Sequence, residues 1–243
     1  MRRNGDKASR RRFLKYTAGV AAAATVVATG YGVYELIKRA DAPEPSSQPT
    51  DEKPTAPGQY YVDDFPVYDI TPDRPGFDPA AWRFRVWGAV ENEVEWSWDE
   101  VIQLPTVEVV TDFHCVTRWS KKALVWEGIP TQRIVEFADP DPDVVQVMAH
   151  CAEGYTTNIP LEYMSMEDSL LALSFNGEPL TPEHGAPLRL LVPQLYGYKS
   201  AKYLQGLEFQ TEWESGYWES RGYHLIGDPW KEQRYYHNPG SPI

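Results

Sequence analysis

The sequence predicts an α+β domain in which mixed sheets are joined by short helices. Short segments in which apolar and polar residues alternate recur along the chain, as half-buried strands require. The helical segments between them are only a turn or two long, and strands and helices do not alternate regularly. A regular alternation would have favoured a parallel α/β sheet, so this mixture favours the α+β class.

The first 42 residues carry the features of an export signal. Three consecutive arginines precede Phe-Leu-Lys within residues 9–15, and an apolar run follows over residues 16–34. This order resembles a twin-arginine signal, which is associated with proteins that fold before export, often around a cofactor. We therefore expect the twin-arginine export machinery as a partner and a periplasmic location or one on the outer face of the cytoplasmic membrane. An ordinary signal anchor is the alternative.

The end of this signal leaves two outcomes open. Ala40-Asp41-Ala42 has the form of a cleavage site, but Pro43 directly after it disfavours cleavage. The apolar run approaches the roughly 20 residues that span a bilayer, so an uncleaved membrane anchor is the alternative. Residues 43–58 contain five prolines among Ser, Thr and acidic residues, which predicts an extended linker. Residues 59–243 are then predicted to form one domain.

The chain beyond the signal is strongly acidic. Residues 43–243 carry fourteen Lys/Arg and thirty-two Asp/Glu. Such a surface repels nucleic acid, and no basic patch interleaved with aromatic residues is present, so we expect no nucleic-acid partner. A solvated acidic surface that favours solubility is the simplest interpretation; cationic partners or a saline habitat are the alternatives.

The first elements of the domain follow from local patterns. Trp82, Phe84 and Val86 alternate with arginines and predict a half-buried strand. Ser97 with Glu100 three residues later predicts a capped short helix, which ends before a proline. Two strands are predicted after it, over residues 107–111 and 144–149, followed by a helix of a turn or two over residues 166–173. A buried strand between prolines is predicted over residues 188–192, and a last alternating strand over residues 201–211.

The two cysteines have two interpretations. By count alone, Cys115 and Cys151 in an exported chain predict a disulfide. Cys115, however, directly follows a predicted strand and lies beside His114 and near Arg118, where cations favour a thiolate. A thiolate binds metals that prefer soft ligands, whereas a four-ligand zinc set is not completed, since only His114 and His150 are nearby.

A second group of residues predicts a phosphate site. Arg189 lies in an otherwise apolar strand, and a buried guanidinium needs an anion such as phosphate or carboxylate. Lys199 and Lys202 follow a turn that contains Gly197, whose backbone amides suit the same anion. The alternative is that each cation pairs with a structural Asp or Glu.

A series of motifs in one fixed order connects these two groups. The motifs are residues 113–120 (FHCVTRWS), 126–130 (WEGIP), 154–155 (GY), 171–172 (LA), 176–180 (NGEPL), 185–189 (GAPLR) and 196–202 (YGYKSAK). Together they resemble the molybdopterin-binding domain of the sulfite oxidase family, with its α+β fold of mixed sheets. The similarity is strongest to the haem-free bacterial and archaeal branch, which includes the catalytic subunit of the envelope methionine-sulfoxide reductase. The resemblance covers roughly residues 60–225.

This resemblance implies a molybdenum–molybdopterin cofactor and a set of residues that hold it. One Cys thiolate binds molybdenum in this family, and the matching position is Cys115. The implied pterin contacts are His184, Arg189, Ser200, Ala201 and Lys202, joined by Cys151 and, in a more loosely aligned segment, by Pro66 and Val67. With both cysteines near the cofactor, the resemblance disfavours the disulfide.

The resemblance also implies an activity. The family catalyses two-electron oxygen-atom transfer, so we expect an oxidoreductase that acts on a small molecule, with sulfur-containing molecules among the candidates. Arg118 and Tyr217 are the candidates for catalytic residues, although the family's sulfite-binding arginines and active-site tyrosine are not clearly reproduced. Trp119 and the aromatic residues of segment 216–223 are expected to shape the substrate entrance.

The resemblance also bears on the electron-transfer partner, and two alternative functions stay open. No haem domain precedes the predicted domain and no immunoglobulin-like domain follows it, so we expect a separate electron-transfer partner, either a membrane cytochrome or a soluble carrier. The alternatives are a non-catalytic exported binding module with a Cys115–Cys151 disulfide, and a pterin-binding scaffold without turnover.

Overall fold

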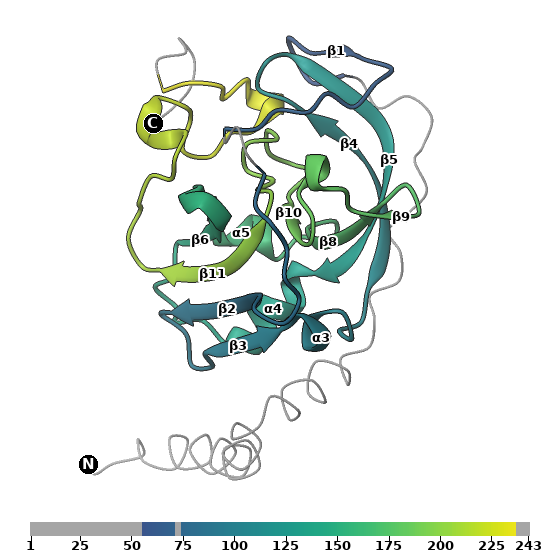
Figure 1. The fold of residues 1–243 in the computed structure, drawn as a ribbon. Helices are drawn as coiled ribbons and strands as arrows, with labels where there is room; N and C mark the ends of the chain where they lie inside the picture. The colour runs from purple at the N-terminus through teal and green to yellow at the C-terminus, as the bar shows by residue number, and fades with distance from the viewer. Residues whose placement is uncertain (1–54, 71–73, 237–243) are drawn as a thin grey trace, which may run out of the picture.

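The computed structural model of the chain describes residues 55–70 and 74–236, which fold into two β-sheets with short helices (Figure 1). The signal or anchor predicted over residues 1–42 lies outside the described residues, as does most of the linker predicted over residues 43–58. Among the described residues, no helix has both the length and the apolar character that a membrane crossing needs.

The first sheet is built around one long strand. β5 pairs with β1 in parallel and with β4 and β8 antiparallel, while β9 and β10 add to β8. Its six strands are β1 (Tyr60–Tyr61), β4 (Val107–His114), β5 (Trp119–Pro130), β8 (Leu170–Phe175), β9 (Glu178–Pro179) and β10 (Arg189–Leu191). The inner side of this sheet carries a buried cluster that includes Phe113, Trp119 and Trp126.

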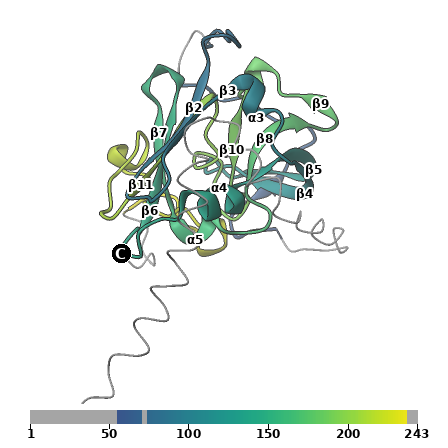
Figure 2. The same cartoon turned by 90° about the horizontal axis from the view of Figure 1, so that it is seen from below.

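The second sheet joins segments that are far apart in the sequence. In the order β3-β2-β11-β6-β7, the central strand β11 is parallel to β2 and antiparallel to β6. The strands are β2 (Arg83–Gly88), β3 (Val94–Ser97), β6 (Gln146–Cys151), β7 (Thr156–Pro160) and β11 (Leu204–Gln210). Seen from below, this sheet and the first lie on opposite sides of the domain, and β10 is the strand of the first sheet that lies toward the middle (Figure 2).

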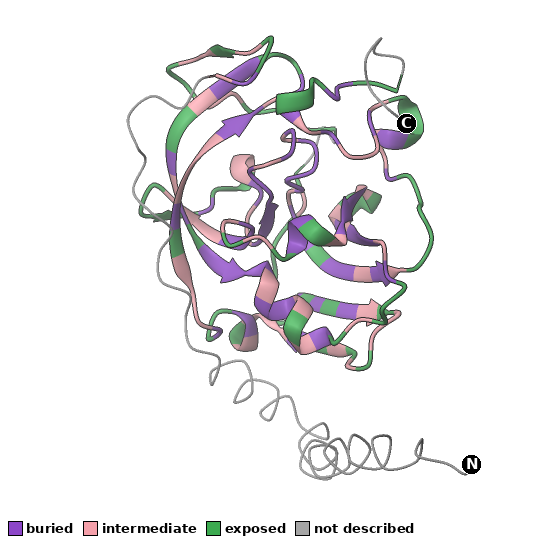
Figure 3. Cartoon of the chain, turned by 180° about the vertical axis from the view of Figure 1, so that it is seen from behind, coloured by how far each residue is buried: buried purple, intermediate pink, exposed green. Residues whose placement is uncertain are grey.

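The space between the sheets is filled by the larger part of the core. Phe84, Val147 and Leu207 from the second sheet pack in one cluster with Ile134 and with Leu190 of β10. Ile134 belongs to α4 (Thr131–Ala138), and the other α-helices of the described residues are α3 (Trp98–Val101) and α5 (Leu161–Met164), besides four 3-10 helices of three residues each. Figure 3 shows that the buried residues, in purple, are concentrated in the strands of the two sheets. The predicted α+β class with mixed sheets and short helices is confirmed.

Two of the predicted elements show where local patterns succeed and fail. Ser97 caps α3 as expected: its Oγ accepts from the backbone N–H of Glu100 at 3.4 Å, and the Glu100 carboxylate accepts from the N–H of Ser97 at 2.8 Å. The helix predicted over residues 166–173 is wrong, because β8 begins at Leu170. β8 pairs with β5 on one side and β10 on the other. A strand enclosed in this way is a continuous apolar run, which local periodicity cannot distinguish from a buried helix.

Candidate cofactor site

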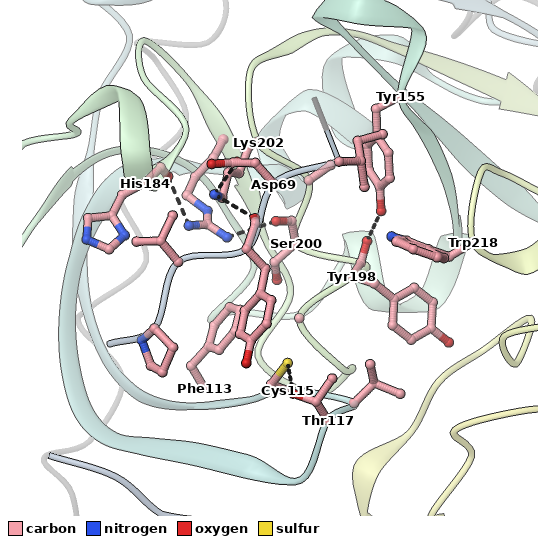
Figure 4. Close-up of a pocket in the computed structure, with 18 of the residues that line it drawn as sticks. Asp69, Phe113, Cys115, Thr117, Tyr155, His184, Tyr198, Ser200, Lys202 and Trp218 are labelled. Atoms are coloured by element: carbon pink, nitrogen blue, oxygen red, sulfur yellow. Dashed lines mark hydrogen bonds and ion pairs between the residues drawn. The ribbon is translucent and has the colours of Figure 1, made fainter. Parts of the chain in front are cut away.

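A cavity of about 370 Å³ opens beside the carboxyl end of β4. Its walls come from five parts of the chain: the segment of residues 65–70, the β4–β5 turn with its flanking residues, Ala152 and Tyr155 after β6, the stretch from His184 to Tyr203, and the aromatic residues Trp218 and Tyr223. Cys115 lies at one end of the cavity, whereas His184, Asp69 and Lys202 lie at the other (Figure 4). The cavity therefore brings the predicted metal ligand and the predicted phosphate site to one place.

Cys115 is held in the tight turn that connects β4 and β5. Its N–H donates to the carbonyl of Trp119 at 2.9 Å, and its own carbonyl accepts from the N–H of Arg118 at 3.0 Å. Arg118 has a positive φ of 82°, which lets the chain reverse. The Cys115 Sγ lies on the cavity wall, 3.1 Å from the hydroxyl of Thr117.

The charge state of Cys115 differs from the sequence-based expectation. Burial raises the pKa of its thiol; hydrogen bonds from Thr117 and the charge of Arg234 act in the opposite direction but do not overcome the burial. The protein alone therefore favours the thiol, whereas a bound metal deprotonates a coordinating thiol. Arg118, the cation that the sequence placed beside Cys115, is exposed.

Arg189 is a buried cation without a close carboxylate in the described part of the chain. Its guanidinium donates to the carbonyls of His184 and Ser200, both at 2.9 Å, and Nε has no partner among the described residues. The guanidinium also lies over the rings of Phe113 and Trp126. Burial lowers the pKa of Arg189 to about 10, so the side chain stays charged at neutral pH. A charge that is balanced only by carbonyls and rings can accept an anion from the cavity.

Lys202 lies next to Arg189 but already contacts an acidic side chain. Its Nζ donates to a carboxylate oxygen of Asp69 at 2.6 Å and to the carbonyls of Tyr68 and Glu183 at 2.9 Å and 2.6 Å. Burial lowers the pKa of Lys202, and the hydrogen bond that Lys202 donates to Asp69 raises it. A phosphate at this end of the cavity would meet two cations and would compete with Asp69 for one of them.

Lys199 is not part of the phosphate site that the sequence predicted. Its Nζ donates to Glu219 at 2.5 Å, to the carbonyl of Leu225 at 2.6 Å and to the backbone and side-chain oxygens of Asn158, and the side chain is fully buried. The neighbours of Lys199 in the turn, Tyr198 and Ser200, face the cavity, which directs Lys199 the opposite way. For Lys199 the alternative interpretation is correct: the cation pairs with a structural acidic residue, Glu219.

The other predicted pterin contacts divide into two groups. The first group lines the cavity and consists of His184, Ser200, Ala201, Pro66 and Val67. The His184 ring stacks on Phe65 at 5.0 Å between centroids, and burial together with Arg189 and Lys202 lowers its pKa, so the imidazole is neutral at neutral pH.

Cys151, Arg118 and Tyr217 do not belong to the cavity wall. Cys151 is buried at the end of β6, where burial raises the pKa of its thiol. Tyr217 packs between Tyr155 and the guanidinium of Arg221. These three residues were predicted to lie at the cofactor or substrate, but the structure places them elsewhere. β6 directs Cys151 into the core, the turn directs Arg118 outward, and Tyr217 packs against its neighbours.

Both cysteines are free, so the Cys115–Cys151 disulfide is wrong, and with it the stapled binding module.

Sequence reasoning missed several residues of the site. Asp69 was not predicted, although it lies three positions after the predicted contact Pro66. Tyr155 and Tyr198 line the cavity with their rings, and the hydroxyl of Tyr155 donates to the carbonyl of Tyr198 at 2.6 Å. The expected aromatic entrance is present in part, because Trp119, Trp218 and Tyr223 line the cavity.

Comparison with known proteins agrees with this geometry. The chain matches the model of the oxidoreductase molybdopterin-binding domain family over residues 71–218. It is 44% identical over 180 residues to the uncharacterised oxidoreductase YuiH of Bacillus subtilis (strain 168), which covers 74% of this chain and 90% of the relative. It is 35% identical over 150 residues to a putative protein-methionine-sulfoxide reductase subunit, YedZ1, of Azospira oryzae, which covers 62% of this chain and 57% of that one.

A solved structure shows the same fold. The sulfane dehydrogenase SoxCD from Paracoccus pantotrophus superposes with a TM-score of 0.52 at 20% identity, over 57% of this chain and 40% of the other. This chain spans little more than half of the Azospira relative and less than half of the SoxCD chain. The family match, the identity to YuiH and the cavity confirm the resemblance found in the sequence: the chain belongs to the oxidoreductase molybdopterin-binding domain family of sulfite oxidase type, and it is a molybdopterin-dependent oxidoreductase.

Proposed function

We propose that this oxidoreductase catalyses a two-electron oxygen-atom transfer on a small substrate, with Cys115 as the protein ligand of the molybdenum. The observation that carries the proposal is that the Cys115 thiol and the buried, carboxylate-free guanidinium of Arg189 face the same cavity. When bound, the cofactor supplies the oxygen-atom and electron chemistry. The protein supplies a ligand, a phosphate site and a shaped entrance.

The residues present fit the cofactor. A thiol at one end of the cavity suits a metal that prefers soft ligands, and two cations at the other end suit a phosphate. The unpartnered Nε of Arg189 is a buried donor that a phosphate oxygen would satisfy. Ser200 fixes this donor group, because its carbonyl accepts from Arg189 while its hydroxyl accepts from the N–H of Val192 at 3.0 Å.

The entrance beside Cys115 favours a neutral substrate. Trp119, Trp218 and Tyr223 present aromatic surfaces there, and the hydroxyl of Tyr198 already donates to the carbonyl of His224 at 2.5 Å. Arg118, the candidate for binding an anionic substrate, does not line the cavity. We therefore propose sulfoxides and N-oxides as substrates ahead of sulfite, which carries negative charge. The Azospira relative, named as a putative protein-methionine-sulfoxide reductase subunit, supports sulfoxides.

The setting of the reaction follows from the sequence. We propose export by the twin-arginine route, because residues 9–34 combine the consecutive arginines with the apolar run. On the same reasoning we propose that the enzyme acts in the periplasm or on the outer face of the cytoplasmic membrane. A separate carrier, either a membrane cytochrome or a soluble protein, would exchange electrons with it.

Metal analysis tests the role of Cys115. Protein purified from a molybdate-supplied host is compared with the Cys115→Ala and Cys151→Ala variants by mass spectrometry of the metal. We expect stoichiometric molybdenum in the parent protein and in Cys151→Ala, whose thiol is buried away from the cavity, and a large loss in Cys115→Ala. Full molybdenum in Cys115→Ala would overturn the assignment.

The substrate class is tested by turnover. The purified enzyme is assayed with a reduced redox dye against methionine sulfoxide, dimethyl sulfoxide and an N-oxide, and with an oxidised dye against sulfite. We expect faster turnover with the sulfoxides and N-oxide than with sulfite. Sulfite as the best substrate would refute the preference for neutral molecules.

A further inference from the structure

We infer that Arg234 is a positioning residue of the cofactor site: it fixes the turn that carries Cys115 and places a permanent positive charge behind that turn. The inference rests on the proposed role of Cys115 as the metal ligand. Arg234 lies in the C-terminal segment, beyond the residues 71–218 that match the family model. Its contribution therefore comes from a part of the chain outside the recognised domain pattern.

Arg234 holds the Cys115 turn through the backbone. Its Nη1 donates to the carbonyl of Val116, the residue directly after Cys115, at 2.6 Å. Two hydrogen bonds inside the turn close the hairpin, but both link residues of the turn to each other. Three further contacts tie the turn to other segments. The side chain of Gln59 donates to the carbonyl of Cys115 and the N–H of Tyr60 donates to the carbonyl of Arg118, both at 2.9 Å, and Arg234 supplies the third contact, the charged one of the three. A shift of the Val116 carbonyl would move the attached Cys115, so this bond restrains where Sγ can lie.

The segment that carries Arg234 is itself anchored at the cavity. Tyr235 pairs with Tyr223, which lines the cavity, and the carbonyl of Arg234 accepts from the N–H of His224 at 3.1 Å. In Figure 1 this yellow segment returns to the upper part of the domain, where β4 and β5 meet. The same segment therefore supplies one aromatic wall of the cavity and the support for the Cys115 turn.

The charge of Arg234 is enclosed and only weakly balanced. The side chain is 4% exposed, its Nη2 donates to the carbonyl of Pro57 at 3.3 Å, and the guanidinium lies over the buried ring of Tyr196 at 4.9 Å. Nε has no partner within the described residues. The ion pair with Glu232 is long, at 3.9 Å, and the Glu232 carboxylate is half-exposed. Most of the balance of this cation thus comes from carbonyls and a ring.

A buried charge in this position acts on the group that Cys115 holds. Charges interact more strongly inside a protein than in water, because the effective dielectric constant is lower. Arg234 is close enough to act in this way, because its Nη1 contacts the carbonyl of Val116, the residue next to Cys115, and its side chain is buried. A fixed positive charge stabilises the more reduced, more negatively charged state of a nearby redox centre. Arg234 is therefore expected to raise the reduction potential of the bound cofactor.

Three variants of the full-length, cofactor-loaded enzyme separate position from charge. Arg234→Met removes both the charge and the hydrogen bonds, whereas Arg234→Lys keeps the charge but loses the planar fork. Arg85→Met is the matched control, because Arg85 also lies over an aromatic ring, that of Trp87, but is exposed on the second sheet. Each protein is measured for molybdenum content, midpoint potential and the electron paramagnetic resonance spectrum of the half-reduced enzyme.

The expected results differ between the variants. Arg234→Met should show a midpoint potential shifted to more negative values and an altered spectrum. Arg234→Lys should keep the potential closer to that of the parent but still alter the spectrum, and Arg85→Met should match the parent in both. A loaded Arg234→Met with the potential and the spectrum of the parent would overturn the inference. If Arg234→Met retains no molybdenum, Arg234→Lys decides alone: an altered spectrum supports the inference, and an unchanged spectrum overturns it.

The same series distinguishes failure of this inference from failure of the proposed function. The Cys115→Ala variant is loaded and measured in parallel. If it keeps full molybdenum and the parent spectrum, the ligand assignment is wrong whatever the Arg234 variants show. If it loses molybdenum while the Arg234 variants match the parent, only the role of Arg234 is wrong.

Discussion

Lys199 and Glu219 form an ion pair in which both side chains are fully buried. Replacing Lys199 with Met would leave the Glu219 carboxylate buried with, among the described residues, the hydroxyl of Thr157 as its remaining side-chain donor, at 2.6 Å. Breaking a buried pair in this way costs about 3–5 kcal/mol of unfolding free energy. We expect Lys199→Met to lose stability of this order in urea unfolding of the purified protein.

The control for this prediction removes both charges. A double variant, Lys199→Met with Glu219→Leu, leaves no uncompensated carboxylate and should regain most of the loss. We expect the pair to contribute because the Lys199 ammonium donates to four surrounding acceptor oxygens, and a single Lys199→Met variant as stable as the parent would contradict this.

Residue types near the site were predictable, but their partners were not. Cys115 and Arg189 were found because a cysteine after a strand and an arginine inside an apolar strand are locally unusual. Lys199 and Lys202 look equivalent in the sequence, yet one faces the core and the other the cavity. The difference depends on Glu219 and Asp69, which come from distant segments, and no local pattern contains that information.

At the scale of elements, β5 and β8 approach each other closely at Gly128. A Cβ at this position would lie 2.3 Å from the carbonyl oxygen of Leu171, a backbone atom that cannot move without shifting β8. Overpacking of this kind costs about 1–3 kcal/mol. We expect Gly128→Ala to lower the urea midpoint of unfolding accordingly.

Gly76→Ala is the matched control for this prediction, since a Cβ there meets no heavy atom within 4 Å. It should unfold at nearly the parental urea concentration. Equal effects of the two substitutions would mean that the loss reflects glycine flexibility in general rather than the contact between β5 and β8.

The elements were predictable where a single face is buried. β2 and the cap of α3 follow from alternation and from the Ser97–Glu100 pair, and both are present. β8 was predicted as a helix because it is enclosed by neighbours on both sides, so its sequence lacks alternation. The pairing of β2 with β11 could not be predicted from the sequence, because the two strands are far apart in the chain and no local pattern links them.

At the scale of the whole molecule, the acidic surface should govern how the enzyme meets electron carriers. Residues 43–243 carry thirty-two acidic and fourteen basic residues, so cationic carriers are attracted over a distance that salt shortens. We expect the rate of electron exchange with a cationic dye such as methyl viologen to fall as the salt concentration rises. The rate with an anionic carrier such as ferricyanide should rise instead.

The comparison is made by stopped-flow measurement with both carriers on the same loaded enzyme. An opposite response of the two dyes identifies the charge of the surface as the cause, because other effects of salt would change both rates in the same direction. Rates that do not depend on salt for either dye would contradict long-range attraction.

The parallel pairing of β2 with β11 also has a consequence for protein synthesis. β2 is made early, but the edge that it presents to β11 stays unpaired until translation has passed Gln210. The cavity is completed later still, because Trp218 and Tyr223 are among its walls. A nascent chain on the ribosome therefore has no finished site to receive the pterin. Cofactor insertion must therefore follow the synthesis of both sheets and of the aromatic walls up to Tyr223, so translation of the domain and supply of the cofactor are separate steps.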